Sequence, residues 1–164
     1  MTPEELCEIE AIKRVKYRYL RGLDQKRWDE VEACFTEGAT AAYSGGKYSY
    51  EGRAAILDFL RRSMGAETFL SSHRCHHPEI DLVDPGAAVG TWALDDVVIE
   101  TQWDITIRGA AFYTDEYVKQ DGEWKISRTG YKRTYEEIQP RGSIPGLKLT
   151  ASWWATDGRS ELDA

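Results

Sequence analysis

The sequence predicts an α+β domain, because helical periodicity fills its first part and strand alternation its second. Apolar residues recur at steps of three or four from Leu6 to Leu23, which predicts one amphipathic helix. After Phe69 the pattern alternates as in strands, and 84–86 and 121–122 supply turns. We therefore expect a curved antiparallel sheet packed on N-terminal helices around an internal pocket.

Local signals place the elements. Thr2 and Glu5 form a capping box with Pro3 at the first helical position, so the first helix starts there and ends near 22–24. A Gly45-Gly46 turn separates two short strands. The other expected elements are helices at 28–35 and 53–63 and strands at 39–43, 48–50, 72–83, 88–100, 107–119 and 124–135.

Length and charge exclude several classes of protein. The 164 residues carry a net charge of −7, so a basic face for general nucleic-acid binding is not expected. No apolar run approaches the ~20 residues that span a bilayer. The three cysteines form no CxxC pair, which predicts reduced thiols in a cytoplasmic protein. The 12% of aromatic residues suits a core, a pocket wall or a subunit interface.

The composition changes near the end of the last expected strand. We expect one domain over 1–138 and an irregular arm over 139–164 that contains Pro140, Pro145 and two tryptophans, Trp153 and Trp154. Docking of its apolar residues would make the arm a lid over the pocket. The polar end, 157–164, is expected to be disordered.

Strand alternation indicates a carboxylate on an apolar face. Asp96 shares a face with Trp92, Leu94 and Val98, and Asp95 lies on the other face. A carboxylate among apolar residues needs a partner, since an unpaired buried charge is very costly. Alternation alone does not choose between Asp95 and Asp96, and an ordinary surface carboxylate is the other interpretation.

All three histidines lie between His73 and His77, and a regular strand places His73, Cys75 and His77 on one face. No second ligand cluster accompanies them, so we expect no metal site. A catalytic imidazole is the stronger functional interpretation, because its pKa lies near working pH.

Three further residues are candidates for an internal site. Tyr19 lies on the apolar stripe of the first helix, where its hydroxyl needs a hydrogen-bond partner. Asp24 lies about 140° further round an ideal helix, so a joint role requires it to sit in the following turn; its alternative role is to cap the next helix. Arg133 shares a strand face with Tyr131 and Tyr135 and serves either a surface ion pair or an internal anion clamp.

Short segments in a fixed order give the chain a family resemblance. It resembles the SnoaL-like branch of the NTF2-like superfamily, especially the bacterial bile acid 7α-dehydratases, and more distantly scytalone dehydratase and hexachlorocyclohexane dehydrochlorinase. The matching segments are Ile9–Lys13, Tyr19–Asp24, Trp28–Glu30, His76–Ile80, Gly109–Asp115 and Thr129–Glu137. The resemblance covers the chain up to about Glu137.

The resemblance implies an NTF2-like (cystatin-like) cone and elimination without metal or organic cofactor. The family's catalytic positions match Tyr19, Asp24, His73, Asp96 and Arg133, and the match selects Asp96 over Asp95. For substrate contacts we expect the aromatic residues Tyr113, Trp92, Phe112, Trp153 and Trp154.

The implied reaction is loss of water from a 7α-hydroxy-3-oxo-Δ4 steroid, as free acid or coenzyme A thioester. His73 would remove the acidified C6 proton, and Asp24 or Asp96 would fix its tautomer. The alternatives are a ketosteroid-isomerase-like proton shuttle and a non-catalytic binding or scaffold protein, neither of which needs the whole residue set. The resemblance also implies a homo-oligomer, a trimer or a dimer.

Overall fold

The computed structural model describes residues 1–162, which fold into three helices and one six-stranded sheet. The helices are α1 (Pro3–Asp24), α2 (Trp28–Ala33) and α3 (Arg53–Met64). The strands are β1 (Phe35–Tyr43), β2 (Tyr48–Glu51), β3 (Phe69–Asp84), β4 (Ala87–Glu100), β5 (Ile105–Gln120) and β6 (Glu123–Pro140). Single 3₁₀ turns, η1 (Ser44–Gly46) and η2 (Arg141–Ser143), follow β1 and β6. This confirms the predicted α+β class.

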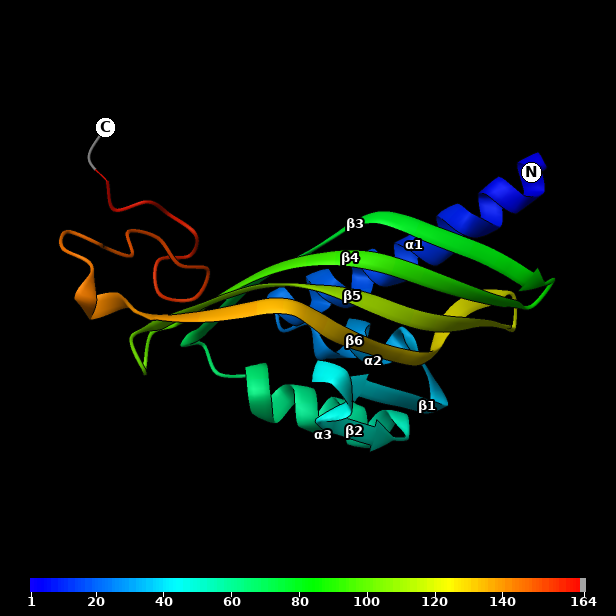
Figure 1. Ribbon diagram of the computed structural model, residues 1–164, viewed down its shortest axis with the longest axis horizontal. Coiled ribbons are helices and arrows are strands. Elements are labelled where there is room, and N and C mark those ends of the chain that lie inside the picture. The colour runs from blue at the N-terminus through cyan, green and yellow to red at the C-terminus, as the bar shows by residue number, and fades with distance from the viewer. Residues whose placement is uncertain (163–164) are drawn as a thin grey trace.

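The four long strands form one curved layer, and α1 crosses behind it (Figure 1). The sheet order is β2-β1-β6-β5-β4-β3. Its pairs are antiparallel except β1 with β6, which run parallel, so the sheet is mixed rather than wholly antiparallel. Gly130 permits this approach, because a Cβ there would lie 2.7 Å from the Ala42 carbonyl oxygen.

Helix α1 forms where its capping signals predict. The Thr2 hydroxyl accepts from the Glu5 N–H, and the Glu5 carboxylate accepts from the Thr2 N–H in return. The apolar stripe of the helix packs against the inner face of the sheet, and Ile12 and Tyr19 are fully buried there. Of the helices in residues 1–162, none is long and apolar enough to cross a membrane.

Strand β4 shows the alternation that the sequence predicts. Trp92, Leu94, Asp96 and Val98 are all buried, whereas Asp95 is exposed. Burial of Asp96 therefore follows from its phase in the strand, and the choice between the two aspartates agrees with the structure.

The ends of some helices and strands differ slightly from the predicted ones. Helix α2 ends at Ala33 because Phe35 already pairs with Ile126 of β6. Strand β6 continues past 138 to Pro140, paired with Ile105. Over residues 144–162 the arm has no helix or strand, and Glu161 donates its N–H to the Thr150 carbonyl. Residues 163 and 164 of the predicted disordered end lie outside the described residues.

Candidate active site

A cavity of about 360 Å³ lies between the helices and the inner face of the sheet. That volume is within the range of small-molecule sites. Its aromatic lining consists of Tyr19, Tyr43, Tyr48, Phe59, Phe69, Tyr113 and Tyr131. Its charged or titratable lining consists of His73, Asp96, Arg133 and Glu136. The charged groups are thus few and set in a wall of aromatic and aliphatic side chains.

His73 and Asp24 form a hydrogen-bonded pair at this wall. The Asp24 Oδ1 atom lies 2.7 Å from His73 Nδ1, and its Oδ2 accepts the His73 backbone N–H at 2.9 Å. The Ser71 hydroxyl donates to Oδ1 at 2.8 Å. In a neutral imidazole, a carboxylate acceptor favours the proton on Nδ1 and leaves the lone pair on Nε2. Within residues 1–162, no protein group hydrogen-bonds Nε2.

The end of α1 explains this pairing. Asp24 is the last residue of the helix, where β3 passes alongside, so its carboxylate turns toward Ser71 and His73. The alternative capping role is not observed, because Arg27 is the N-cap of α2 and makes no side-chain cap bond. Of the two aspartates considered for His73, Asp24 is therefore its partner.

Asp96 instead pairs with Arg133. The Arg133 Nη2 atom donates to Asp96 Oδ2 at 2.9 Å, and Nη1 donates to Oδ1. Burial lowers the pKa of Arg133, but the hydrogen bonds and charge of Asp96 outweigh it and raise that pKa. Asp96 is 5% exposed, so the pair neutralises an otherwise very costly buried carboxylate.

Two backbone features let Arg133 reach Asp96 across the intervening strand. Gly109 of β5 stands opposite Asp96, and a Cβ there would lie 2.7 Å from Arg133 Nη1. A register shift in β6 opposite Ala110 and Ala111 leaves Thr134 unpaired. This bulge breaks the alternation, so Tyr135 is exposed rather than on the Arg133 face, and Glu136 lines the cavity.

Phenolic hydroxyls supply neutral hydrogen-bond donors. Tyr19 and Tyr43 lie with their hydroxyl oxygens 3.1 Å apart, so one donates to the other and one proton stays available. Burial raises the pKa of Tyr19, Tyr43 and Tyr113. These side chains therefore stay protonated at neutral pH.

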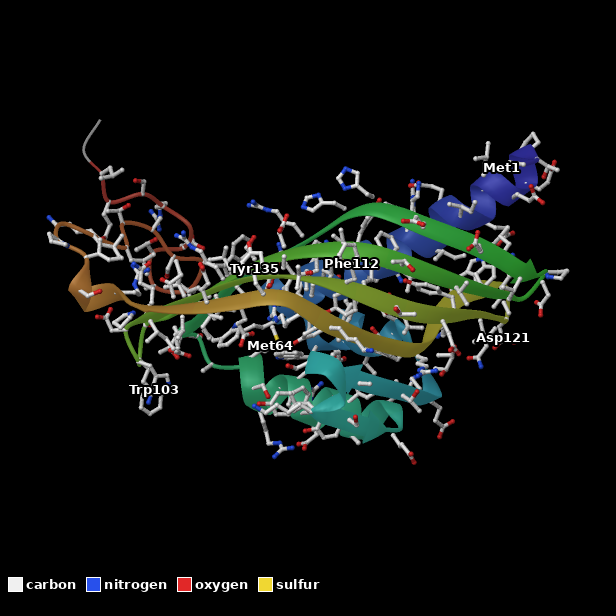
Figure 2. The ribbon with its side chains drawn as sticks, viewed as in Figure 1. Met1, Met64, Trp103, Phe112, Asp121 and Tyr135 are labelled. Atoms are coloured by element: carbon white, nitrogen blue, oxygen red, sulfur yellow. The ribbon has the colours of Figure 1, made fainter. Side chains whose placement is uncertain are left out.

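Two aromatic residues expected at the cavity lie elsewhere. Trp92 is fully buried in the core, where its Nε1–H donates to the Tyr117 hydroxyl at 3.0 Å. Phe112 is 56% exposed on the opposite face of the sheet (Figure 2). The phase of β5 explains this placement, because Ala111 and Tyr113 take the buried face.

The arm tryptophans also lie outside the cavity lining. Trp153 is 58% exposed and packs edge-on against Trp154. Trp154 lies beside Lys26, whose ammonium is 5.3 Å from its ring centroid. Lys26 donates to the carbonyl of Phe69, which does line the cavity. Lys26 therefore links the arm to the cavity wall.

The histidines of the 73–77 segment lie on different sides of the sheet, with His73 at the cavity and His76 beside Asp95. Within residues 1–162 no group of three or more His, Cys, Asp or Glu side chains is arranged to hold a metal ion. A bulge after His76 gives His77 a φ of 47° and interrupts the expected alternation. His76 is partly exposed and faces Asp95, 3.4 Å away, on the outer side of β3 and β4.

Several site residues were missed from the sequence. Tyr43, Tyr131 and Glu136 line the cavity, yet no sequence pattern separated them from other aromatic or acidic residues. Lys16 and Asp115 form a fully buried ion pair of 2.7 Å beside it. A signal for this pair existed, because Lys16 lies on the apolar stripe of α1 and Asp115 alternates with Tyr113 and Tyr117.

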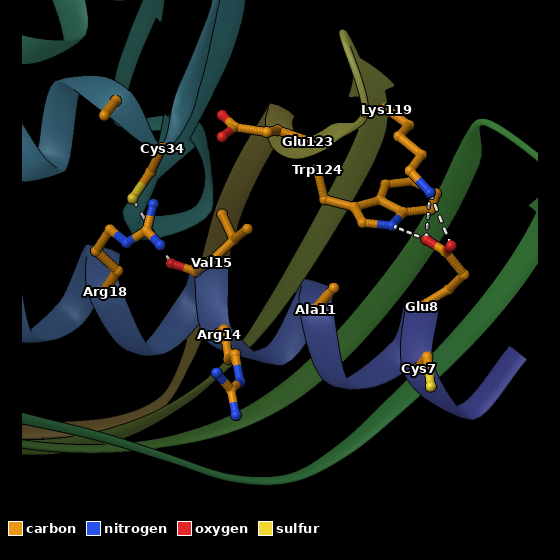
Figure 3. A pocket seen from close by; sticks show the side chains of 12 residues that line it. Cys7, Glu8, Ala11, Arg14, Val15, Arg18, Cys34, Lys119, Glu123 and Trp124 are labelled. Carbon is orange, nitrogen blue, oxygen red and sulfur yellow. Dashed lines mark hydrogen bonds and ion pairs between the residues drawn. The ribbon is translucent and has the colours of Figure 1, made fainter. Parts of the chain in front are cut away.

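A separate pocket lies between α1 and the turn joining β5 to β6 (Figure 3). One of its two carboxylates, Glu8, accepts two hydrogen bonds from Lys119 and one from the Trp124 indole. The Cys34 thiol lies at its inner end and donates to the Glu30 carbonyl at 3.1 Å. No residue of the His73–Asp24 pair lines this pocket.

Comparison with known proteins agrees with this architecture. Over 98% of the chain and 100% of the other, the structure matches a scytalone dehydratase-like protein from Novosphingobium aromaticivorans DSM 12444, with 26% identity and a TM-score of 0.76. It matches the type 2 form of hexachlorocyclohexane dehydrochlorinase (LinA) over 87% and 97% of the two chains, with 20% identity and a TM-score of 0.76. For LinA type 3 from Novosphingobium barchaimii LL02 the coverage is 88% and 95%, the identity 20% and the TM-score 0.75.

The LinA likenesses concern the fold alone, which is NTF2-like. A family model, the SnoaL-like domain, matches residues 4–130, which include all of α1 but its first residue, the His73–Asp24 pair and Asp96. The chain therefore belongs to the SnoaL-like domain family.

Proposed function

We propose that this protein is a cofactor-independent dehydratase that removes water from a hydroxy-steroid or a similar polycyclic hydroxy-ketone. The observation that carries the proposal is the His73–Asp24 pair, which presents a free imidazole nitrogen at the wall of an aromatic cavity. Bile-acid-like 7α-hydroxy-3-oxo-Δ4 steroids are the substrate class with the matching chemistry.

The reaction needs a base for a weakly acidic carbon. In such a steroid the conjugated ketone acidifies the C6–H bond, and His73 Nε2 takes that proton. The electron pair forms the C6–C7 double bond while the C7–O bond breaks. The imidazolium then returns the proton to the departing hydroxyl, and water leaves. Asp24 stabilises the imidazolium, and such general acid–base help is worth ~10²–10⁴-fold in rate.

The tyrosine hydroxyls can donate hydrogen bonds to the negative charge that develops on the ketone oxygen. Tyr19 and Tyr43 share one hydroxyl–hydroxyl contact and keep one proton for a ligand, and Tyr113 adds a second neutral donor. A preorganised donor of this kind contributes ~10²–10³-fold. Arg133 holds Asp96 at the same wall, so we assign this pair to substrate orientation.

A structural relative and the aromatic wall of the cavity both support an elimination reaction on a bulky apolar molecule. The scytalone dehydratase-like relative aligns over the whole of its chain, and its name denotes removal of water. Flat rings of Phe59, Tyr48 and Tyr50 stack along one side of the cavity region. Such a wall suits the faces of fused rings.

The same base and donors would serve a ketosteroid-isomerase-like shuttle, in which a proton moves and no group leaves. A non-catalytic ligand carrier would bind the steroid unchanged. The homotrimer or dimer, the cytoplasmic location and the choice between free acid and coenzyme A thioester stay predictions from the sequence.

One assay separates these functions. The purified protein is incubated with a 7α-hydroxy-3-oxo-Δ4 steroid, and the absorbance of the 4,6-dien-3-one is followed. Dehydration gives the red-shifted dienone. A protein that only moves the double bond of a 3-oxo-Δ5 steroid is an isomerase, and one that binds steroids without converting any is a carrier. Either result overturns the dehydratase proposal.

A further inference from the structure

A second charged network lies in the core next to the cavity. The Lys16 Nζ atom donates to Asp115 Oδ2 at 2.7 Å, and both side chains are 0% exposed. The Thr129 and Tyr117 hydroxyls also donate to Asp115, at 2.7 and 2.8 Å. Trp92 donates to Tyr117 in turn. Every carboxylate oxygen of Asp115 thus has a partner.

A buried ion pair of this kind contributes little to the stability of a fold. The desolvation of two charges consumes most of their mutual attraction, and apolar residues of similar volume are often as stable in its place. Buried charges beside a cavity therefore call for a functional reason.

The position of the Lys16 ammonium supplies that reason. It lies 3.3 Å from the ring centroid of Tyr113, and Tyr131 packs edge-on against the same ring. Tyr113 lines the cavity, and no group in residues 1–162 hydrogen-bonds its hydroxyl. A cation against an aromatic face is attracted to the π electrons, most strongly where water is excluded. It draws electron density from the ring and makes the phenol a stronger donor.

We propose that Lys16 is a positioning residue that acts through Tyr113: its buried ammonium, held by Asp115, fixes the ring and strengthens the hydroxyl that donates to the ligand's ketone oxygen. This inference rests on the proposed function for the identity of the ligand. Its first test uses Tyr113→Phe, which keeps the ring over Lys16 and removes only the donor. Dienone formation should fall ~10²-fold in kcat, as for loss of one oxyanion donor. Unchanged kcat overturns the proposal.

The second test is a double-mutant cycle. Lys16→Met with Asp115→Asn replaces the ion pair by neutral side chains of similar volume. With Tyr113 present, this neutral pair should lower kcat ~10-fold, a part of the full donor effect, with little change in KM. In the Tyr113→Phe background it should change kcat less than ~2-fold. Equal losses in both backgrounds would assign Lys16 a structural role only.

A third readout needs no substrate. A 3-fluorotyrosine placed at 113 is followed by ¹⁹F NMR during a pH titration. The neutral pair removes two opposing charges at once: the Lys16 ammonium, 3.3 Å from the ring centroid, which favours the phenolate, and the Asp115 carboxylate, which raises the pKa of Tyr113. The proposal requires the ammonium to dominate, so the neutral pair should move the ionisation midpoint upward. A midpoint that stays or moves downward contradicts the inference. If no steroid is dehydrated but the midpoint moves upward, the proposed function fails and the Lys16–Tyr113 relationship stands.

Discussion

The Asp24 carboxylate lies 2.7 Å from His73 Nδ1, although 49 residues separate the two along the chain. One oxygen of Asp24 also accepts the backbone N–H of the same histidine. The carboxylate therefore holds the β3 backbone at His73 and orients the imidazole toward the cavity. A general base requires such a fixed orientation.

Replacement of this carboxylate should disable the base. We expect Asp24→Asn to lower kcat by ~10²-fold or more, because the imidazolium loses its counter-charge and Nδ1 its fixed tautomer. Steady-state dienone formation measures the change. Asp29→Asn, on the exposed first turn of α2, is the control and should match the wild type. Equal rates for both variants would remove Asp24 from the mechanism.

The two adjacent aspartates of β4 should differ sharply in stability. Asp96→Asn removes the buried carboxylate of the pair and leaves the half-buried Arg133 with Glu136 alone, 3.1 Å from its Nε, so the cost should approach the about 3–5 kcal/mol of a broken buried pair. Asp95→Asn removes only an exposed carboxylate, worth about 0–1 kcal/mol. Urea unfolding followed by circular dichroism measures both. Similar midpoints would show that the Asp96–Arg133 pair does not form.

The Arg133–Asp96 contact should depend on the absence of a side chain at Gly109. A Cβ at this position would lie 2.7 Å from Arg133 Nη1 and 2.9 Å from the Tyr135 carbonyl oxygen. Gly109→Ala should therefore displace Arg133 from Asp96, with a stability loss of about 1–3 kcal/mol and a raised KM. At Gly38 no atom lies within 4 Å of an added Cβ, so Gly38→Ala is the matched control. A Gly109→Ala variant as stable and as active as this control would contradict the crossing of Arg133 over β5.

The buried thiols predict a loss of stability at high pH. Burial raises the pKa of both Cys34 and Cys75 from 9.0 to about 11. The folded state thus favours the neutral thiol, and this stabilisation is complete below pH 9.0 and lost as the pH rises toward about 11. Unfolding midpoints in urea at pH 8, 10 and 11 should decline in that order, and a flat profile would be inconsistent with these pKa values. At pH 8 iodoacetamide should label the exposed Cys7 first.

Much of the fold follows from periodicity, because each element buries one face. The alternation that predicts a buried Asp96 in β4 also predicts a buried Asp115 in β5, because Asp115 shares a strand face with Tyr113 and Tyr117. The Asp96–Arg133 contact could not be predicted this way, since it depends on a bulge at Thr134 and on the absent side chain of Gly109. Phe112 was misplaced because its neighbours Ala111 and Tyr113 are also apolar, so hydrophobicity alone leaves the phase of that stretch open.

The long-range pairing of His73 illustrates the same limit. Sequence indicated both residues, but two aspartates fitted the role, and only the position of β3 beside the end of α1 selects Asp24. Hydrophobic periodicity could not predict the position of the arm, because its tryptophans are placed by contacts with Lys26 and with each other.

The most direct test compares two histidines in the dienone assay. His73→Ala removes the proposed base, whereas His76→Ala removes a partly exposed imidazole on the outer side of the sheet. We predict that His73→Ala forms the 4,6-dien-3-one at least ~10²-fold more slowly than the wild type, with its circular dichroism spectrum unchanged, and that His76→Ala keeps the wild-type rate. A folded His73→Ala variant that forms the dienone as fast as the wild type would contradict the assignment of His73 as the base.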